Sequence, residues 1–182
     1  EIATAVKGEG GAVILVPAEP AALPPPGTRV AQELDWERRH RHMRMHTALH
    51  LLAALVARPV TGGQVGTERG RLDFDLPAPL EDLPGLEARL AALVAADLPV
   101  RVEWITEEEL AANPGLVRTL SVAPPKGQGR VRLIRIGQGA QTVDLQPCGG
   151  THVASTGELG ALRIGKVEKK GRQNRRVSLD FI

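Results

Sequence analysis

The segment "DWERRHRHMRMHTALHLLAALVARP", residues 35–59, decides the fold because it predicts one long helix with an apolar face. Asp35 can accept a hydrogen bond from the first backbone amides and so begin a helix over residues 36–57. Pro59 has no amide hydrogen and prevents the helix from continuing. The helical repeat points five long apolar side chains inward: Met43, Met45, Leu49, Leu52 and Leu55.

Strand and helix signals follow this segment. The run "TGGQVGTERG", residues 61–70, is expected to be a glycine-rich loop, and "RLDFDL", residues 71–76, alternates as a half-buried strand does. Helices are expected over residues 83–96 and, capped by Thr106, through residue 112. Further strands are expected at residues 99–106, 130–137, 141–146, 161–168 and 175–182. Long helices followed by clustered strands favour an α+β fold, in which the long helix packs on a mostly antiparallel sheet.

The N-terminal part differs in composition. "GEGGAVILVP", residues 8–17, predicts a turn feeding a buried strand, and "PAEPAALPPPG", residues 17–27, predicts a proline-rich connector. We therefore expect two parts: a partial, barrel-like β module with its connector at residues 1–33, and the main domain at residues 34–182.

Composition limits the class of protein. The 182 residues are 42% hydrophobic and 24% charged, which is ordinary for a globular chain. The sequence offers neither an apolar run of bilayer length nor a signal peptide, so a cytoplasmic location is the default expectation.

Basic residues cluster in two places although the formal net charge is only +2. The clusters are "RRHRHMR", residues 38–44, and "RIGKVEKKGRQNRR", residues 163–176. They are either solvated faces or contacts to nucleic-acid phosphates. With no tyrosine, two phenylalanines and two tryptophans, an aromatic platform for single-stranded bases has little support.

Two distant motifs offer metal ligands. In "HTALH", His46 and His50 stand four residues apart, so both imidazoles leave the same face of the helix. In "QPCGGTHVAST", residues 146–156, the only cysteine, Cys148, and His152 flank a flexible glycine turn. Three nitrogens and one sulfur form a tetrahedral set that suits zinc better than magnesium or calcium. The long helix is therefore expected to be the metal-binding helix of the fold.

Two other chemistries use the same residue types. A metalloprotease would place glutamate directly after the first histidine, where this sequence has Thr47. A nucleophilic pair of Cys148 and His152 remains an alternative, but it leaves the paired helical histidines unexplained.

The motifs "HTALHLL", "CGGTHV" and "GRQNRRV" together resemble the AlaX-type alanyl-tRNA editing proteins and the editing domain of alanyl-tRNA synthetase, over residues 35–182. The resemblance implies an aminoacyl-tRNA deacylase that serves translation fidelity by hydrolysing the ester between alanine tRNA and a wrong amino acid, chiefly serine and also glycine. It implies Zn²⁺ bound through His46, His50, Cys148 and His152. It implies mischarged alanine tRNA as the partner, with neither a membrane nor DNA. Freestanding members carry a small β-barrel in front, and residues 5–17 are similar to its end.

Further site residues follow from the chemistry of ester hydrolysis. Backbone amides of Gly149, Gly150 and Thr151 are candidate oxyanion donors. A polar side chain near the zinc should form a hydrogen bond with the serine hydroxyl and so reject alanine. The candidates are Thr47, Gln64 and Thr67, with Gln146 and Asp144 behind them. The candidates for phosphate contacts are Lys169, Lys170, Arg175 and Arg176.

Three functions stay open on the sequence. The favoured one is a freestanding editing hydrolase. The others are a structural zinc module that binds RNA without releasing an amino acid, and an editing-domain fragment of alanyl-tRNA synthetase. Since four protein ligands close a tetrahedral zinc, the metal is expected mainly to shape the pocket and hold the substrate.

Overall fold

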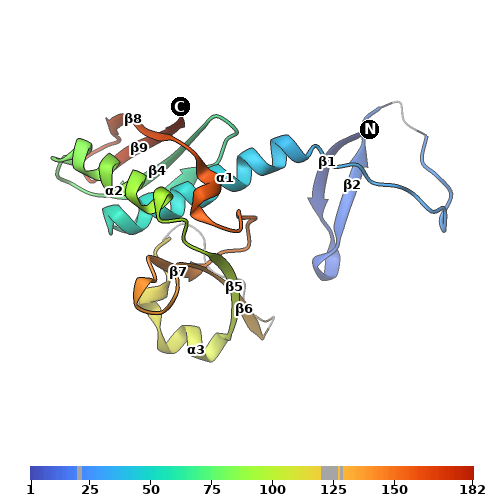
Figure 1. Cartoon of the computed structure of the whole chain (residues 1–182). Helices are drawn as coiled ribbons and strands as arrows, with labels where there is room; N and C mark the ends of the chain where they lie inside the picture. The colour runs from blue at the N-terminus through green and yellow to red at the C-terminus, as the bar shows by residue number, and fades with distance from the viewer. Residues whose placement is uncertain (20–21, 120–126, 128) are drawn as a thin grey trace. The chain divides into compact units, whose positions relative to one another are not determined.

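The computed structural model describes residues 1–19, 22–119, 127 and 129–182, and the chain divides into two compact units, Glu1–Leu34 and Asp35–Ile182 (Figure 1). In the first unit, β1 (Ile2–Lys7) pairs antiparallel with β2 (Val13–Pro17). The prediction of a buried strand here was wrong, since Val13 is 70% exposed and Ile14 is 51% exposed. A two-stranded ribbon cannot bury both of its faces. Part of the expected proline-rich connector, at residues 20–21, lies outside the described residues.

The long helix of the second unit, α1 (Trp36–Val56), begins and ends as the sequence predicts. Asp35 Oδ1 accepts a hydrogen bond from the Arg38 amide at 3.0 Å, and Ala57 ends the helix in the left-handed conformation with φ 52°. Of the five side chains expected to point inward, Met45, Leu49 and Leu52 are buried, while Met43 and Leu55 are half-buried. The helix therefore presents its apolar face mainly from its C-terminal half.

Twelve shorter elements accompany α1 in the described part of the second unit, and the predicted α+β class is confirmed. A four-stranded antiparallel sheet has the order β3-β4-β9-β8, with β3 at Val60–Gln64, β4 at Arg69–Asp75, β8 at Leu162–Lys169 and β9 at Asn174–Phe181. A three-stranded antiparallel sheet has the order β5-β6-β7, with β5 at Val100–Thr106, β6 at Arg130–Ile136 and β7 at Asp144–Pro147. The remaining helices are α2 (Leu83–Ala95), capped by Asp82, and α3 (Glu107–Ala112), capped by Thr106. Three short 3-10 helices complete the described part of this unit: Pro114–Leu116 after α3, Gly139–Gln141 before β7 and Thr156–Leu159 after β7.

The expectation of a glycine-rich loop at residues 61–70 was wrong for its first half, which forms β3. Gly63 pairs with Leu72 of β4, and a side chain on Gly63 would begin 2.9 Å from the Leu72 Cδ2 atom. Glycine is therefore needed here for the close approach of two strands. Residues 65–68 connect the two strands, and the last two residues of the run, Arg69 and Gly70, already belong to β4.

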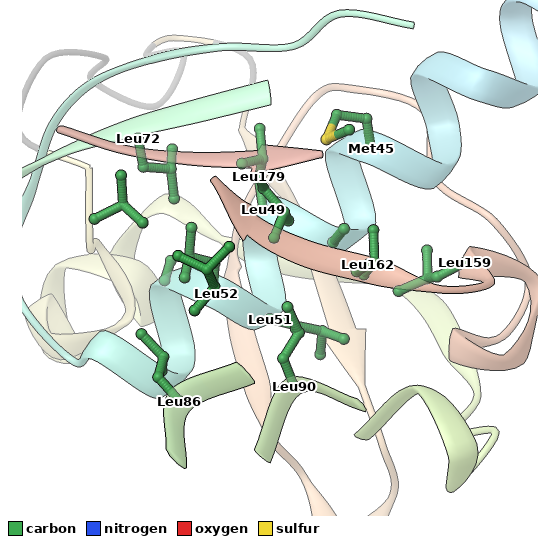
Figure 2. Packing of buried hydrophobic residues seen from close by; sticks show 14 of the residues in the cluster. Met45, Leu49, Leu51, Leu52, Leu72, Leu86, Leu90, Leu159, Leu162 and Leu179 are labelled. Atoms are coloured by element: carbon green, nitrogen blue, oxygen red, sulfur yellow. The ribbon is translucent and has the colours of Figure 1, made fainter. Parts of the chain in front are cut away.

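The core lies against α1, which contacts α2, β4 of the larger sheet and β7 of the smaller sheet (Figure 1). Figure 2 shows leucines of α2, β4 and β9 packed around the leucines of α1. Each fully buried leucine contributes about 1.5–3 kcal/mol relative to an exposed one. This packing fixes α1 firmly and thereby fixes the side that carries His46 and His50. Within the described residues, the helices are too short or too polar to cross a membrane.

Candidate metal centre and adjoining cavity

Four side chains from two distant parts of the chain converge beside the middle of α1. His46 and His50 come from α1, while Cys148 and His152 come from the loop that follows β7. Their potential ligand atoms all lie within 4.8 Å of one another. Cys148 Sγ lies 3.6 Å from His46 Nε2 and 3.4 Å from His152 Nε2. Zinc bonds of about 2.0–2.3 Å place tetrahedral ligands about 3.3–3.8 Å apart, so this donor set fits a tetrahedral metal ion.

Hydrogen bonds on the far side of two rings aim their other nitrogens at the cluster. His50 Nδ1 donates to Asp144 Oδ2 at 2.8 Å. The Thr47 hydroxyl donates to the Met43 carbonyl at 3.0 Å, which leaves its oxygen to accept from His152 Nδ1 at 3.0 Å. Such partners fix the tautomer and orientation of a metal-binding histidine. The structure thus gives Thr47 a positioning contact to His152.

Asp144 is the buried carboxylate of this centre, with 1% of its surface exposed. Besides His50, it receives a hydrogen bond from Gln146 Nε2 at 2.7 Å. Its other oxygen, Oδ1, lies 3.2 Å from Arg118 Nε, an ion pair in which neither atom has a hydrogen bond to the described residues. A buried carboxylate without partners would be costly, and these three groups together compensate its charge.

The cluster strongly perturbs its own protonation. Burial alone would raise the pKa of the Cys148 thiol, but hydrogen bonds from His152, His46 and His50 outweigh burial and lower this pKa to about 3. Burial would lower the pKa of His50, yet the hydrogen bond to Asp144 and the contact with Cys148 raise it to about 9. Burial lowers the pKa of His152 to about 4, with a further lowering by the charge of His50. The hydrogen bond to Cys148 acts in the opposite direction but is outweighed. Without a metal, a thiolate and an imidazolium therefore face each other at neutral pH.

The turn between Cys148 and His152 is held close to α1. A side chain on Gly150 would begin 2.3 Å from the His46 Cε1 atom, whereas one on Gly149 would meet nothing within 4 Å. Arg132 Nη1 donates to the carbonyls of Cys148 and Gly150 at 2.6 and 2.8 Å. The Gly150 amide donates to Cys148 Sγ at 3.4 Å. Of the two glycines in the motif, only Gly150 has no room for a side chain.

A cavity of about 540 Å³ opens beside the cluster, and His46, His50 and Cys148 form part of its wall. Apolar side chains supply much of the rest, including Leu49, Val60 and Leu72. Polar groups and one aromatic residue complete the lining at Gln64, Trp104, Arg118, Arg130, Arg132 and Gln146. A mostly apolar cavity with a few polar groups is typical of a binding site for a small chemical group.

The residues expected to act in catalysis and selectivity lie in different places in the structure. Gln64, Gln146 and Gly149 line the cavity. Thr47 and Asp144 lie behind the four converging side chains, where Thr47 contacts His152 and Asp144 contacts His50. The Gly150 amide is directed at the Cys148 sulfur, and Thr151 is exposed. Thr67 lines a different hollow, together with Asp35 and with Arg38 and Arg41 of the first basic cluster.

The second basic cluster is not one continuous cationic surface. Lys169 and Lys170, at the end of β8, are exposed. Arg175 is buried and donates to the backbone carbonyls of Asn174 and Pro77. Arg176 forms an ion pair with Asp73 at 2.7 Å. The two arginines are therefore engaged within the sheet.

The first basic cluster is also partly engaged inside the fold. Arg44 donates to the Leu159 carbonyl and lies 4.4 Å over the Phe181 ring, a favourable cation–π geometry. Arg41 pairs with Glu37 at 3.2 Å and with Glu68. These arginines attach the N-terminal half of α1 to the surrounding elements.

Three residues of the site were not identified from the sequence: Arg118, Arg132 and Trp104. Arg132 stands in an alternating strand, so its orientation was readable in principle, but its two carbonyl partners arise only from the folded loop. Arg118 follows a short 3-10 turn, and its sequence carries no pattern that points to Asp144. Trp104 was placed on a strand without a role.

The fold and the site define an α+β domain in which four side chains are arranged so that they could hold a metal ion. Residues 131–178, which include Cys148 and His152, match the family model described as the threonyl and alanyl tRNA synthetase second additional domain.

Curated relatives are more specific. The chain is 33% identical over 156 residues to the alanyl-tRNA editing protein AlaX-M of Methanosarcina acetivorans, covering 83% of this chain and 62% of that protein. The AlaX-M protein of Methanosarcina barkeri is 33% identical over 161 residues, covering 86% of this chain and 65% of that protein. The alanine–tRNA ligase of Pyrobaculum arsenaticum is 36% identical over 155 residues, covering 80% of this chain but 17% of the ligase. The chain thus spans less than two thirds of these AlaX-M relatives, and its resemblance to AlaX-type proteins and to part of alanyl-tRNA synthetase is confirmed.

Proposed function

We propose that this chain is an aminoacyl-tRNA deacylase, a carboxylic ester hydrolase that removes serine, and also glycine, from mischarged alanine tRNA. The observation that carries the proposal is a soft, histidine-rich donor set forming one wall of a 540 Å³ cavity. Similarity to AlaX-M proteins and to a segment of alanine–tRNA ligase supports the choice of substrate. We assign the activity to residues 34–182, and regard residues 1–33 as a partial barrel-like module with its connector.

The metal of this proposal is Zn²⁺, held by His46, His50, Cys148 and His152. A thiolate and three imidazoles match the ligand preferences of zinc, and the 3.4 and 3.6 Å donor separations match its tetrahedral geometry. When bound, zinc would supply a fixed positive charge at the wall of the cavity. Asp144 and Thr47 act one shell further out, where they hold His50 and His152 in the ligating orientation.

Ester hydrolysis can then proceed mainly by positioning. An aminoacyl ester is reactive, so a placed water and a donor for the developing oxyanion are the main requirements. The Gly149 backbone amide is the donor we favour, because Gly149 lines the cavity whereas the Gly150 amide is directed at Cys148. The apolar lining limits the number of waters near the ester.

Gln146 is the residue we propose for selecting serine. Its side chain is buried, lines the cavity, and is held by its hydrogen bond to Asp144 at 2.7 Å. A fixed buried amide that pairs with the serine hydroxyl would be left unpaired by alanine, and such sites discriminate by up to about 10⁴. Gln64 is the second choice, since it is exposed and accepts from Arg71. Glycine has no hydroxyl and needs a different discriminator.

The test is deacylation of seryl-, glycyl- and alanyl-tRNA, all on alanine tRNA, with and without a zinc chelator. We expect release of serine and glycine, preservation of alanine, and loss of activity on chelation or in Cys148→Ala. Tight binding of the tRNA without release of any amino acid would overturn the proposal in favour of a structural zinc module. Serine released at the same rate by Gln146→Leu as by the parent would remove Gln146 as the discriminator.

A further inference from the structure

We infer that Trp104 is the stacking platform for the base of the tRNA's 3′-terminal nucleotide, the nucleotide that carries the ester. The inference rests on the proposed function and specifies how its substrate is held. Trp104 lies on β5, at the edge of the three-stranded sheet, and its side chain is 54% exposed. It nevertheless lines the same cavity as Cys148 and His46. An indole that is open to solvent on the rim of a reaction cavity is suited to an aromatic ligand.

The sheet places this indole at a definite position relative to the metal centre. Trp104 pairs in register with Arg132 of β6, and the Cys148 amide donates to the Arg132 carbonyl at 3.1 Å. These three residues therefore form a row across the sheet. Neighbouring strands are about 4.8 Å apart, so the row places Trp104 about 10 Å from Cys148 along the sheet. One nucleoside bridges such a gap, with its ester end at the cluster and its base at the indole.

The cations around the cavity favour the same ligand. Arg118 is paired with Asp144, and Arg132 holds the two loop carbonyls, so both are used within the site. Arg130 is exposed and pairs in register with Thr106, next to Trp104 on the same face of the sheet. It is therefore placed to contact the phosphate of a nucleotide whose base lies on Trp104. Stacking on one aromatic residue beside a cation is the usual way to hold a single-stranded base.

This arrangement revises the expectation from composition. Low aromatic content argued against a platform for several stacked bases. A single terminal base needs only one aromatic residue, and Trp104 is at the cavity.

A fluorescence titration tests the contact directly. The chain has two tryptophans, so Trp36→Phe leaves Trp104 as the only indole. The probe is adenosine carrying a 3′-serylamino group, an amide that cannot be cleaved as the ester can. We expect saturable quenching of Trp104 fluorescence, and none with the same serylamino ribose lacking the base. Absence of quenching at probe concentrations that fill the site, measured by inhibition of deacylation or by calorimetry, would overturn the inference.

Kinetics supply the second readout. Trp104→Leu should raise KM for mischarged tRNA by about 5- to 150-fold, the range typical of losing one base–aromatic stack, with kcat nearly unchanged. Trp104→Phe should recover most of the loss. The control is Val102→Ala, which removes another exposed apolar side chain from the same strand and is 48% exposed in the parent. Equal KM values for Trp104→Leu and Val102→Ala would also overturn the inference.

The two proposals fail separately. A parent protein that releases no amino acid contradicts the proposed deacylase, whatever the fluorescence shows. A parent that deacylates seryl-tRNA but shows no base-dependent quenching contradicts only the role of Trp104.

Discussion

Replacing Gly150 by alanine would place a methyl group inside the metal centre. The new Cβ atom would lie 2.3 Å from His46 Cε1 and 2.6 Å from His46 Nδ1. Carbon atoms in contact are normally at least about 3.5 Å apart, so the ring or the turn must move by at least about 1.2 Å. Neither can move cheaply, because His46 belongs to a helix packed into the core and Arg132 holds the turn through two carbonyls.

A displacement of this size is more than half of a zinc–nitrogen bond, which is about 2.0 Å long. We expect zinc affinity to fall by at least about 10- to 100-fold, the loss typical of disturbed ligand orientation. Overpacking should also lower the free energy of unfolding by about 1–3 kcal/mol. Competition with a chromophoric zinc chelator measures the first quantity, and denaturant unfolding of the metal-free protein measures the second.

Gly149→Ala is the matched control, because its methyl group would meet nothing within 4 Å. It adds the same atoms one residue earlier in the same turn and should bind zinc as the parent does. Equal zinc affinity for the two alanine variants would refute the reasoning. It would show that His46 is not a ligand or that the turn does not lie as close to α1 as described.

Three further outcomes are expected. Zinc binding at pH 7.5 should release about one proton, from His50, because the pKa of His50 is raised to about 9 while Cys148, with a pKa of about 3, is already a thiolate. Calorimetry in buffers of different ionisation enthalpy measures the number of protons released. A release of about two protons would contradict the assignment. Arg176→Ala should reduce stability at pH 7, since hydrogen bonding to Arg176 lowers the pKa of Asp73. A lowered carboxyl pKa stabilises the fold fully above the unfolded value of about 3.9, so in circular-dichroism titrations the difference from the parent should begin to shrink below that pH and be lost as pH falls through the lower folded-state pKa. Removing zinc should lower the thermal midpoint, because the metal connects α1 to the loop after β7; an unchanged midpoint with metal loss verified would count against this coupling.

Local signals predicted much of this fold. Asp35 and Thr106 each cap the helix that the sequence assigned to them, because a cap depends only on residues three or four positions away. The alternation in residues 71–76 likewise gave β4, with Phe74 buried. The convergence of His46, His50, Cys148 and His152 was predicted from the chemistry of their side chains as metal ligands, because no local sequence pattern connects the two motifs.

The errors came from features that only the assembled fold defines. The glycines of β3 are typical of a loop in the sequence. They lie in a strand here, where Gly63 allows Leu72 of the neighbouring strand to pack closely against the backbone. Arg175 and Arg176 look like one cationic patch, but successive residues of a strand point to opposite faces, and here both faces offer oxygen acceptors. Charge counted along a sequence therefore overstates the charge that a surface presents.

The position of β9 has a consequence for synthesis. β9 lies inside the larger sheet, between β4 and β8, although it is the last strand along the chain. During translation, β4 can pair with β3 at once, but its other edge has no partner until β9, about 100 residues downstream, has been made. The apolar core that α1 shares with β9 is incomplete until then. Sheets closed by such distant pairings form slowly and leave apolar surface uncovered meanwhile. A ribosome-bound chain lacking residues 174–181 should be a preferred client of chaperones that shield apolar helices.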